Sequence, residues 1–202
     1  MRILLVGATG TIGAPLATAL EQRGHGVIGV GRSSGDHRAD IADPGSIRAL
    51  YNSVDRIDAV VCAAGRAAFG ALPELGEEDF AITLASKLMG QVNLVRAGLG
   101  RVREGGSFTL TSGTLSQKPE AGTSAVSMAG AAVEAFARGA AIDLRGRYRV
   151  NVVSPGTVAE GRVERGLDPM PGIWAADLAA RYVELVEGDV TGAVIIAEGP
   201  PT

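Results

Sequence analysis

RILLVGATGTIG, residues 2–13, is the stretch that decides the fold, because an apolar run leads straight into three spaced glycines. Between a strand and a helix, Gly7 permits a tight turn, Gly10 lets a pyrophosphate approach the backbone, and Gly13 lets the helix pack on its strand. The N-terminus of that helix offers free N–H groups and the positive end of its dipole to phosphates. We therefore predict a dinucleotide-binding turn, against the alternative of a glycine turn needed only for packing. The predicted contacts come from Gly7, Thr9, Gly10, Thr11, Ile12 and Gly13.

Beyond this turn, short apolar runs alternate with longer helical patterns. The runs are apolar throughout, which is typical of strands covered by helices on both faces. This alternation predicts a Rossmann-type α/β fold, with a doubly wound, mostly parallel sheet of about seven strands between two helical layers, as one domain over residues 1–202. The Gly/Pro-rich segment 155–174 interrupts the pattern and is a candidate lid. Strands are predicted at 2–7, 26–31, 37–41, 58–65, 106–112, 148–154 and 192–199, and helices at 12–23, 44–53, 77–101, 124–141 and 175–186.

Composition narrows the classes of partner. The net charge is −3 and the basic residues are not clustered, which argues against a nucleic-acid partner. The first residues enter a strand pattern without an export signal, and no apolar run approaches the roughly 18 residues that span a bilayer. Cys62 is the only cysteine and there are two histidines, so neither a disulfide nor a metal site is predicted. We expect a cytoplasmic protein with a small-molecule substrate and no membrane partner.

The residues after the second predicted strand indicate which nicotinamide nucleotide is preferred. An acidic side chain there would bind a free ribose 2′-hydroxyl and repel a 2′-phosphate. The chain has Arg32 followed by Ser33 instead, and a guanidinium can pair with a phosphate through two hydrogen bonds. NADP is therefore the predicted cofactor, with NAD as the alternative if Arg32 is only a solvated surface residue.

Five further motifs, in order along the chain, make it similar to the short-chain dehydrogenase/reductase superfamily. They are ADI at 39–41, CAAG at 62–65, TLTSG at 109–113, RVNVVSPG at 149–156 and DVTGAVIIAEG at 189–199. The resemblance implies that Ser112 is the catalytic serine and that the helix predicted at 124–141 joins a subunit interface, giving a homodimer or homotetramer. The cofactor-binding residues that it implies are Asp40 and Ile41 for the adenine, Ala63, Ala64 and Gly65 at a strand end, and Pro155 and Gly156 for the nicotinamide carboxamide.

The helix predicted at 124–141 departs from the family pattern. Family reductases carry a Tyr-x-x-x-Lys pair there, in which the ammonium lowers the pKa of the phenol so that it can donate a proton. The aligned positions hold Val126 and Gly130, and no tyrosine lies between Tyr51 and Tyr148. We therefore predict that this helix supplies no proton.

Lys87 is the predicted replacement for the missing amine. It lies in SKLMGQVNL, residues 86–94, which resembles the family's Asn-Leu-x-Gly segment, so Lys87 stands where relatives carry an active-site Asn. We expect Gly130 to leave room for the longer side chain, and a partly desolvated ammonium can donate a proton or polarise a carbonyl together with Ser112. Ser112 and Lys87 are thus the predicted catalytic residues. The alternative is a lysine that reaches solvent or pairs with a carboxylate.

Three classes of function stay open on the sequence alone. The first is an NADP-dependent oxidoreductase that acts on a small carbonyl or alcohol with a non-standard proton donor. The second is a non-redox enzyme, an isomerase or lyase, and the third is a catalytically silent cofactor-binding protein. The complete phosphate turn favours nucleotide binding, the missing Tyr-x-x-x-Lys pair weighs against the ordinary mechanism, and fold alone does not decide between the classes.

Overall fold

The glycine-rich turn follows the first strand of a seven-stranded parallel sheet in the computed structural model, which describes residues 1–164 and 166–200. The strand order is β3-β2-β1-β4-β5-β6-β7, so the sheet grows in one direction up to β3 and in the other from β4 onward. The prediction of a Rossmann-type sheet is confirmed. The strands are β1 (Arg2–Val6), β2 (Gly26–Gly31), β3 (His37–Arg38), β4 (Ile57–Cys62), β5 (Val102–Thr111), β6 (Arg149–Pro155) and β7 (Val194–Ala197).

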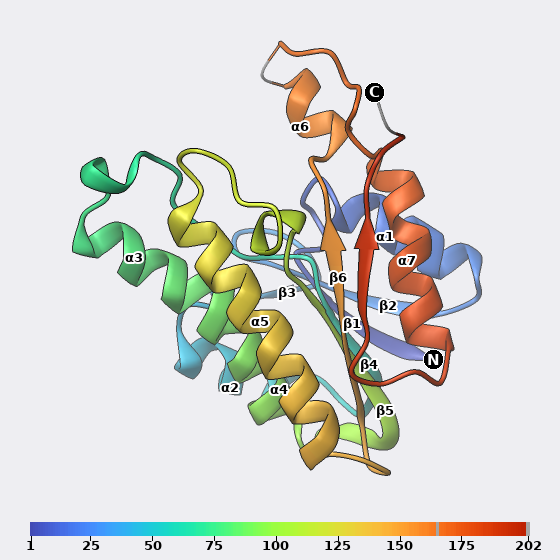
Figure 1. Ribbon diagram of the computed structural model, residues 1–202. Coiled ribbons are helices and arrows are strands. Elements are labelled where there is room, and N and C mark those ends of the chain that lie inside the picture. Colours follow the sequence, from blue (N-terminus) through green and yellow to red (C-terminus); the bar gives the residue numbers. More distant parts are fainter. Residues whose placement is uncertain (165, 201–202) are drawn as a thin grey trace.

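Helices cover both faces of this sheet (Figure 1). Helices α1 and α7 contact each other on one face, and α2, α4 and α5 form a layer on the other. Successive residues of a strand point to opposite faces, so Leu4 belongs to one apolar cluster and Leu5 to the other. This double burial explains the unbroken apolar runs. The helices are α1 (Gly13–Gln22), α2 (Pro44–Ser53), α3 (Glu77–Thr83), α4 (Gln91–Gly98), α5 (Ser124–Asp143), α6 (Ala159–Val163) and α7 (Ala175–Glu187), with short 3-10 turns η1 (Leu72–Glu74) and η3 (Thr114–Ser116).

Helix α2 begins and ends where the sequence predicts. The carboxylate of Asp43 accepts a hydrogen bond from Gly45 N at 2.7 Å, which satisfies one of the free N–H groups of the first turn. Pro44 occupies the first helical position, where no N–H is needed. Local capping chemistry therefore accounts for the start of this helix.

The single helix predicted at 77–101 is instead three consecutive segments. Between α3 and α4 lies a π-helical segment, η2 (Leu84–Gly90), whose wider turn holds one more residue than an α-turn. Gln91 follows it and inserts its side-chain amide between helix and sheet, donating to Lys87 O at 2.8 Å and to Thr111 O at 2.9 Å. Since π-turns are frequent at functional sites, the residues of η2 are candidates for a functional role.

The segment 155–174, which the sequence predicts to be irregular, contains the short helix α6. Val158 also pairs with Ile173 in an isolated parallel bridge, which closes the base of the segment. In Figure 1 this segment stands above the end of β6. Residue 165 of the candidate lid lies outside the described residues.

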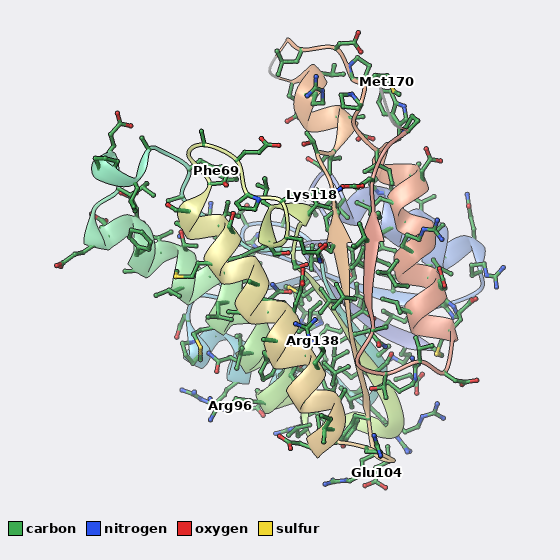
Figure 2. All side chains as sticks on the ribbon, viewed as in Figure 1. Phe69, Arg96, Glu104, Lys118, Arg138 and Met170 are labelled. Carbon is green, nitrogen blue, oxygen red and sulfur yellow. The ribbon has the colours of Figure 1, made fainter. Side chains whose placement is uncertain are left out.

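Helix α5 is the one helix, within the described residues, that is long and apolar enough to cross a membrane by length and composition. The expectation that no apolar stretch approaches that length is therefore wrong for α5. Its inner face, which includes Val133 and Ala137, is buried in the core against the sheet. Its outer face carries Arg138 (Figure 2). A core helix meets the same criteria of length and composition, because its buried face is apolar.

All strands end at the same edge of the sheet, because every neighbouring pair is parallel. Ligands of open α/β sheets bind outside the carboxyl ends of the strands, at the point where the strand order reverses. Figure 2 shows Phe69 and Lys118 at this end of the molecule and Glu104 at the opposite end. We therefore expect the candidate site beside the carboxyl ends of β1, β4, β5 and β6.

Candidate active site

The three glycines of the first turn are required for two different physical reasons, packing within the protein and space for a ligand. Gly7 has φ of 91°, and a Cβ on it would lie 2.9 Å from the backbone of Ala63. A Cβ on Gly13 would lie 1.9 Å from Gly7 O, so packing alone requires both glycines. A Cβ on Gly10 would meet only Gly7 O, at 3.4 Å. Because packing leaves room at Gly10, close approach of a ligand is the remaining reason for a glycine there.

Part of the N-terminus of α1 is left for an anion. Ile12 stands at the N-cap and offers no side-chain acceptor, and Ala14 N already donates to Gly10 O at 3.0 Å, so the N–H groups that precede Ala14 are those left for a ligand. Thr9 and Thr11 lie exposed on the turn that leads into α1. Thr9 Oγ1 also accepts a hydrogen bond from Ser34 Oγ at 3.1 Å, which ties this turn to the loop after β2.

Arg32 and Ser33 lie exposed in that loop, as a residue that reads a ribose substituent should. No ion pair to Arg32 occurs in the part of the chain that the structure describes. The nearest acid along the chain, Asp36, accepts from Gly29 N at 2.7 Å and is engaged there. The guanidinium of Arg32 is therefore available to a phosphate.

The predicted adenine contacts follow β3. Asp40 is partly buried, and its Oδ1 accepts from Ala42 N at 2.9 Å. Ile41 is buried in the core, and a Cβ on Gly90 would lie 3.0 Å from its Cγ1. The Ile41 side chain thus serves packing, and only its backbone can face a nucleotide.

The CAAG motif continues from the end of β4. Ala63 N donates to Val6 O at 2.8 Å, which keeps this strand end beside the glycine turn. Ala64 packs against Gly7, and Gly65 adopts φ of 149°, a conformation that favours glycine. Burial raises the pKa of the Cys62 thiol to about 11, so Cys62 is a neutral core residue and no nucleophile.

A cleft of about 540 Å³ opens beside this edge, at the carboxyl ends of β5 and β6. It is lined by Lys87, Ser112, Pro155 and Gly156, which the sequence predicts as site residues. Val126 also lines it, so an apolar side chain faces the cleft at the position of the family tyrosine. The structure therefore brings the predicted catalytic and nicotinamide-side residues together.

A larger cleft, of about 730 Å³, lies at the opposite end of the sheet. Two of its arginines are paired with carboxylates: Arg103 Nε lies 3.2 Å from Asp58 Oδ1, and Arg147 Nε lies 3.4 Å from Glu104 Oε1. It is remote from the glycine turn and from every predicted site residue. We therefore assign the site to the smaller cleft.

Lys87 enters the cleft from the π-helical turn η2. Its Nζ donates to Ser112 O at 2.8 Å, and its aliphatic chain passes Gly65. Loss of hydration lowers the pKa of Lys87 to about 8. A lysine with this pKa exchanges protons near neutral pH, as a general acid or base must.

The side chain of Ser112 is held by Glu134 of α5, a residue that is not among those predicted from the sequence. Ser112 Oγ donates to Glu134 Oε1 at 2.8 Å, and Glu134 is only 5% exposed. Burial by itself would raise the pKa of Glu134, but hydrogen bonds from Ser116, Ser112, Gln117 and Ser154 lower it below its ordinary value. A buried, ionised carboxylate therefore stands behind the predicted catalytic serine.

The nearest neighbours of Gly130 lie in the loop after β5, whereas the sequence predicts that Gly130 accommodates Lys87. The atoms nearest to a Cβ on Gly130 would be Ser116 Cβ at 3.4 Å, Gly113 O and Ser112 Cβ, both at 3.9 Å. Gly130 thus lets the loop after β5 approach α5, which brings these serines within reach of Glu134. The signal for Glu134 in the sequence is its place two turns after Val126, as the one acidic residue among small and apolar neighbours.

Comparison with known proteins defines the class to which this fold and cleft belong. A family model described as enoyl-(acyl carrier protein) reductase matches residues 7–176. A curated relative, 2,3-dihydro-2,3-dihydroxybenzoate dehydrogenase of Escherichia coli K12, is 29% identical over 169 residues, which cover 77% of this chain and 68% of the relative. The chain belongs to the short-chain dehydrogenase/reductase superfamily, a family of oxidoreductases.

Solved structures agree with this assignment. The protein lin1944 from Listeria innocua is 39% identical with a TM-score of 0.91, and the match covers 97% of this chain and 98% of that one. A small-chain dehydrogenase crystallised in complex with NADPH is 29% identical with a TM-score of 0.87, covering 98% and 97% of the two chains. The similarity therefore extends over almost the whole length of both neighbours.

Proposed function

We propose that the protein binds NADP(H) and interconverts a small carbonyl compound and its alcohol, with Lys87 and Ser112 in place of the usual Tyr-x-x-x-Lys pair. The single observation that carries this proposal is the contact of Lys87 Nζ with Ser112 O, between two residues that line a cleft at the carboxyl ends of β5 and β6. The NADPH complex of a structural neighbour supports the choice of nucleotide.

The residues at this edge fit such a nucleotide. Gly10 leaves space above an uncapped helix N-terminus, and Arg32 is exposed and without an ion-pair partner among the described residues. Pro155 ends β6 and Gly156 follows it, and both line the cleft where the family motif places the nicotinamide side. When bound, the nicotinamide supplies or accepts a hydride, and the protein's task is to bind the substrate oxygen and exchange its proton.

Lys87 is the group suited to that proton exchange. Lys87 lines the cleft, and a pKa of about 8 lets it give up a proton near neutral pH and recover it. The Ser112 carbonyl holds the ammonium in place, so the donor is oriented before a substrate arrives. Val126 also lines the cleft, and its apolar side chain cannot exchange a proton there.

Titration with NADPH and NADH, followed by nicotinamide fluorescence, tests the proposal first. We expect both nucleotides to bind and NADPH to bind more tightly. Turnover of the wild type and of Lys87→Met is then measured on a panel of small aldehydes, ketones and alcohols. Lys118→Met is the control for the loss of a surface lysine. Binding without any turnover would favour a silent or non-redox protein, and absence of binding would overturn the proposal.

The homodimer or homotetramer and the cytoplasmic location implied by the sequence stay proposals. The outer face of α5 carries Met128 and Ile142, which are 41% and 67% exposed, and a partner subunit would cover them. Light scattering coupled to size-exclusion chromatography measures the mass in solution. A monomeric mass at micromolar concentration would contradict the oligomer.

A further inference from the structure

We propose that Glu134 fixes Ser112 as a hydrogen-bond acceptor, so that the cleft selects the alcohol form of its substrate over the carbonyl form. The inference rests on the proposed function and names the oxygen chemistry that the same cleft recognises. Glu134 would then be a positioning residue, because it touches Ser112 and does not itself line the cleft.

Four donors converge on the Glu134 carboxylate. Ser112, Ser116 and Ser154 direct their hydroxyls at Oε1 over 2.8, 2.6 and 3.3 Å, and Gln117 Nε2 lies 3.3 Å from Oε2. These residues come from the end of β5, the turn η3 and the end of β6, so the carboxylate joins three segments around the cleft. An ionised carboxylate has no proton to return, which fixes the direction of every one of these hydrogen bonds.

The direction of the Ser112 hydrogen bond decides what Ser112 can offer to a ligand. A serine hydroxyl has one proton and two lone pairs, and the proton of Ser112 points at Glu134. Hydrogen bonds to a charged acceptor are roughly twice as strong as those between neutral groups. A ligand carbonyl is a neutral acceptor, so it does not win this proton from Glu134. Ser112 Oγ is left with lone pairs alone.

Lys87, in contrast to Ser112 Oγ, can only donate hydrogen bonds as an ammonium. One of its three N–H groups is used by Ser112 O, and no other acceptor for Nζ occurs within residues 1–164 and 166–200. The cleft thus offers N–H donors from Lys87 and an acceptor from Ser112. A hydroxyl satisfies both because it accepts and donates, whereas a carbonyl oxygen accepts only and would set its lone pairs against those of Ser112.

Neutron diffraction from a deuterium-exchanged crystal tests the first step directly. We expect the Ser112 deuteron on the line from Oγ to Glu134 Oε1. A deuteron that points into the cleft would overturn the inference, whatever the protein's activity.

Matched ligands test the second step. Cyclohexanol and cyclohexanone have nearly the same shape, and their dissociation constants can be measured on nucleotide-free protein from amide chemical shifts of cleft residues. We expect cyclohexanol to bind at least about tenfold more tightly, the discrimination of one satisfied hydrogen bond against one left unpaired. Equal affinities, or no binding of either probe at 50 mM, a concentration on the order of that used for weak fragments, would overturn the inference.

Variants separate the role of Glu134 from simple support of the fold. Glu134→Gln replaces the charged acceptor of Ser112 with a neutral amide oxygen, so a ligand carbonyl can compete for the serine proton and the preference for cyclohexanol should fall to about threefold or less. Ser116→Ala is the matched control, because it removes one donor to Glu134 but leaves the Ser112 contact, and its preference should stay unchanged. If Glu134→Gln does not fold, Ser112→Ala decides, since it removes the acceptor itself and should abolish the preference. A preference that persists in Ser112→Ala would refute the proposal.

The two proposals fail in distinguishable ways. Since the probes are measured without nucleotide, loss of the alcohol preference with normal NADPH binding would overturn only the role of Glu134. Absence of NADPH binding would overturn the proposed function, whether or not the cleft prefers cyclohexanol.

Discussion

The side chain of Lys87 lies directly against Gly65, so that a Cβ on Gly65 would stand 3.1 Å from Lys87 Cδ and 3.3 Å from Lys87 Cα. The glycine at the end of the CAAG motif therefore has a role besides any contact with a nucleotide. It lets the π-helical turn come close enough for Lys87 Nζ to reach Ser112 O.

Replacing this glycine should displace the lysine. We expect Gly65→Ala to push Lys87 away from Ser112 and to lower kcat by about tenfold to a hundredfold, because small errors in the position of a catalytic group are costly. Turnover with NADPH measures the effect. Gly146→Ala is the control, since Gly146 also has positive φ, 79°, but nothing lies within 4 Å of its Cβ position. Equal turnover in both variants would contradict the prediction.

The protonation of Lys87 can be observed without a substrate, because the chain has two lysines, Lys87 and Lys118. In protein labelled with ¹³C-lysine, the Lys118→Arg variant shows the signal of a single lysine, Lys87. We expect that signal to titrate with a pKa of about 8. Burial favours the neutral amine, so Lys87 is ammonium below this pH and free amine above it. Carbonyl reduction should therefore slow above pH 8 or so, and alcohol oxidation should quicken. An ordinary lysine titration would contradict this.

The same pKa has a consequence for stability. From pH 8 to the ordinary lysine pKa of 10.5, the unfolded chain binds more protons at position 87 than the folded protein, so the free energy of unfolding gains a contribution that rises with pH. Lys87→Met should lack this rise. Urea unfolding of both proteins at pH values across that window measures the difference, and parallel curves would contradict the prediction.

Arg32 should discriminate between the two nucleotides. Arg32→Ala is expected to weaken NADPH binding by about 1.5–3 kcal/mol, the contribution of a charge-assisted hydrogen bond, and to leave NADH binding nearly unchanged. Fluorescence titration at fixed salt measures both affinities. Arg96→Ala, on the distant helix α4, controls for the change in net charge (Figure 2). Equal losses for NADPH and NADH would show that Arg32 does not bind the extra phosphate.

Gly10 and Gly13 should respond differently to the same added methyl group. Gly10→Ala is expected to leave the thermal midpoint within a few degrees of wild type and to weaken NADPH at least about tenfold, because the new Cβ occupies space left for the phosphates. Gly13→Ala should destabilise the fold itself, since its Cβ would overlap Gly7 O. Calorimetry and NADPH titration separate the two effects. A Gly10→Ala variant with unchanged affinity would remove the main support for the phosphate site.

Much of the fold follows from local patterns in the sequence. The apolar runs predict both the strands and their double burial, and Asp43 with Pro44 sets the start of α2. The glycine spacing predicts the turn between β1 and α1 because Gly7 needs a positive φ and Gly13 packs against Gly7 O, both within the turn itself. The prediction fails for the start of β5. This strand begins at Val102, four residues before the strand predicted from the apolar pattern at 106–112.

The cleft is less readable from the sequence because its contacts are not local. Lys87 can be placed by motif, but the π-turn that carries it depends on Gln91 bonding to Thr111 across the helix–sheet interface. Glu134 receives hydroxyls from three separate segments, and no pattern along one helix reports such convergence. Gly130 illustrates the limit, since its small size serves the approach of the Ser116 loop and not the expected lysine.

The π-helical segment ahead of α4 makes the register of this helix a condition for the chemistry. An α-helix turns by about 100° per residue, so deleting one residue from Leu84–Gly90 would restore an ordinary spiral and rotate everything on one side of the deletion by that angle. Lys87 could then no longer face the cleft while Gln91 keeps its place against β5. Deleting an uncharged residue of this segment would therefore remove Lys87 from the cleft while leaving every side chain that lines the cleft chemically unchanged.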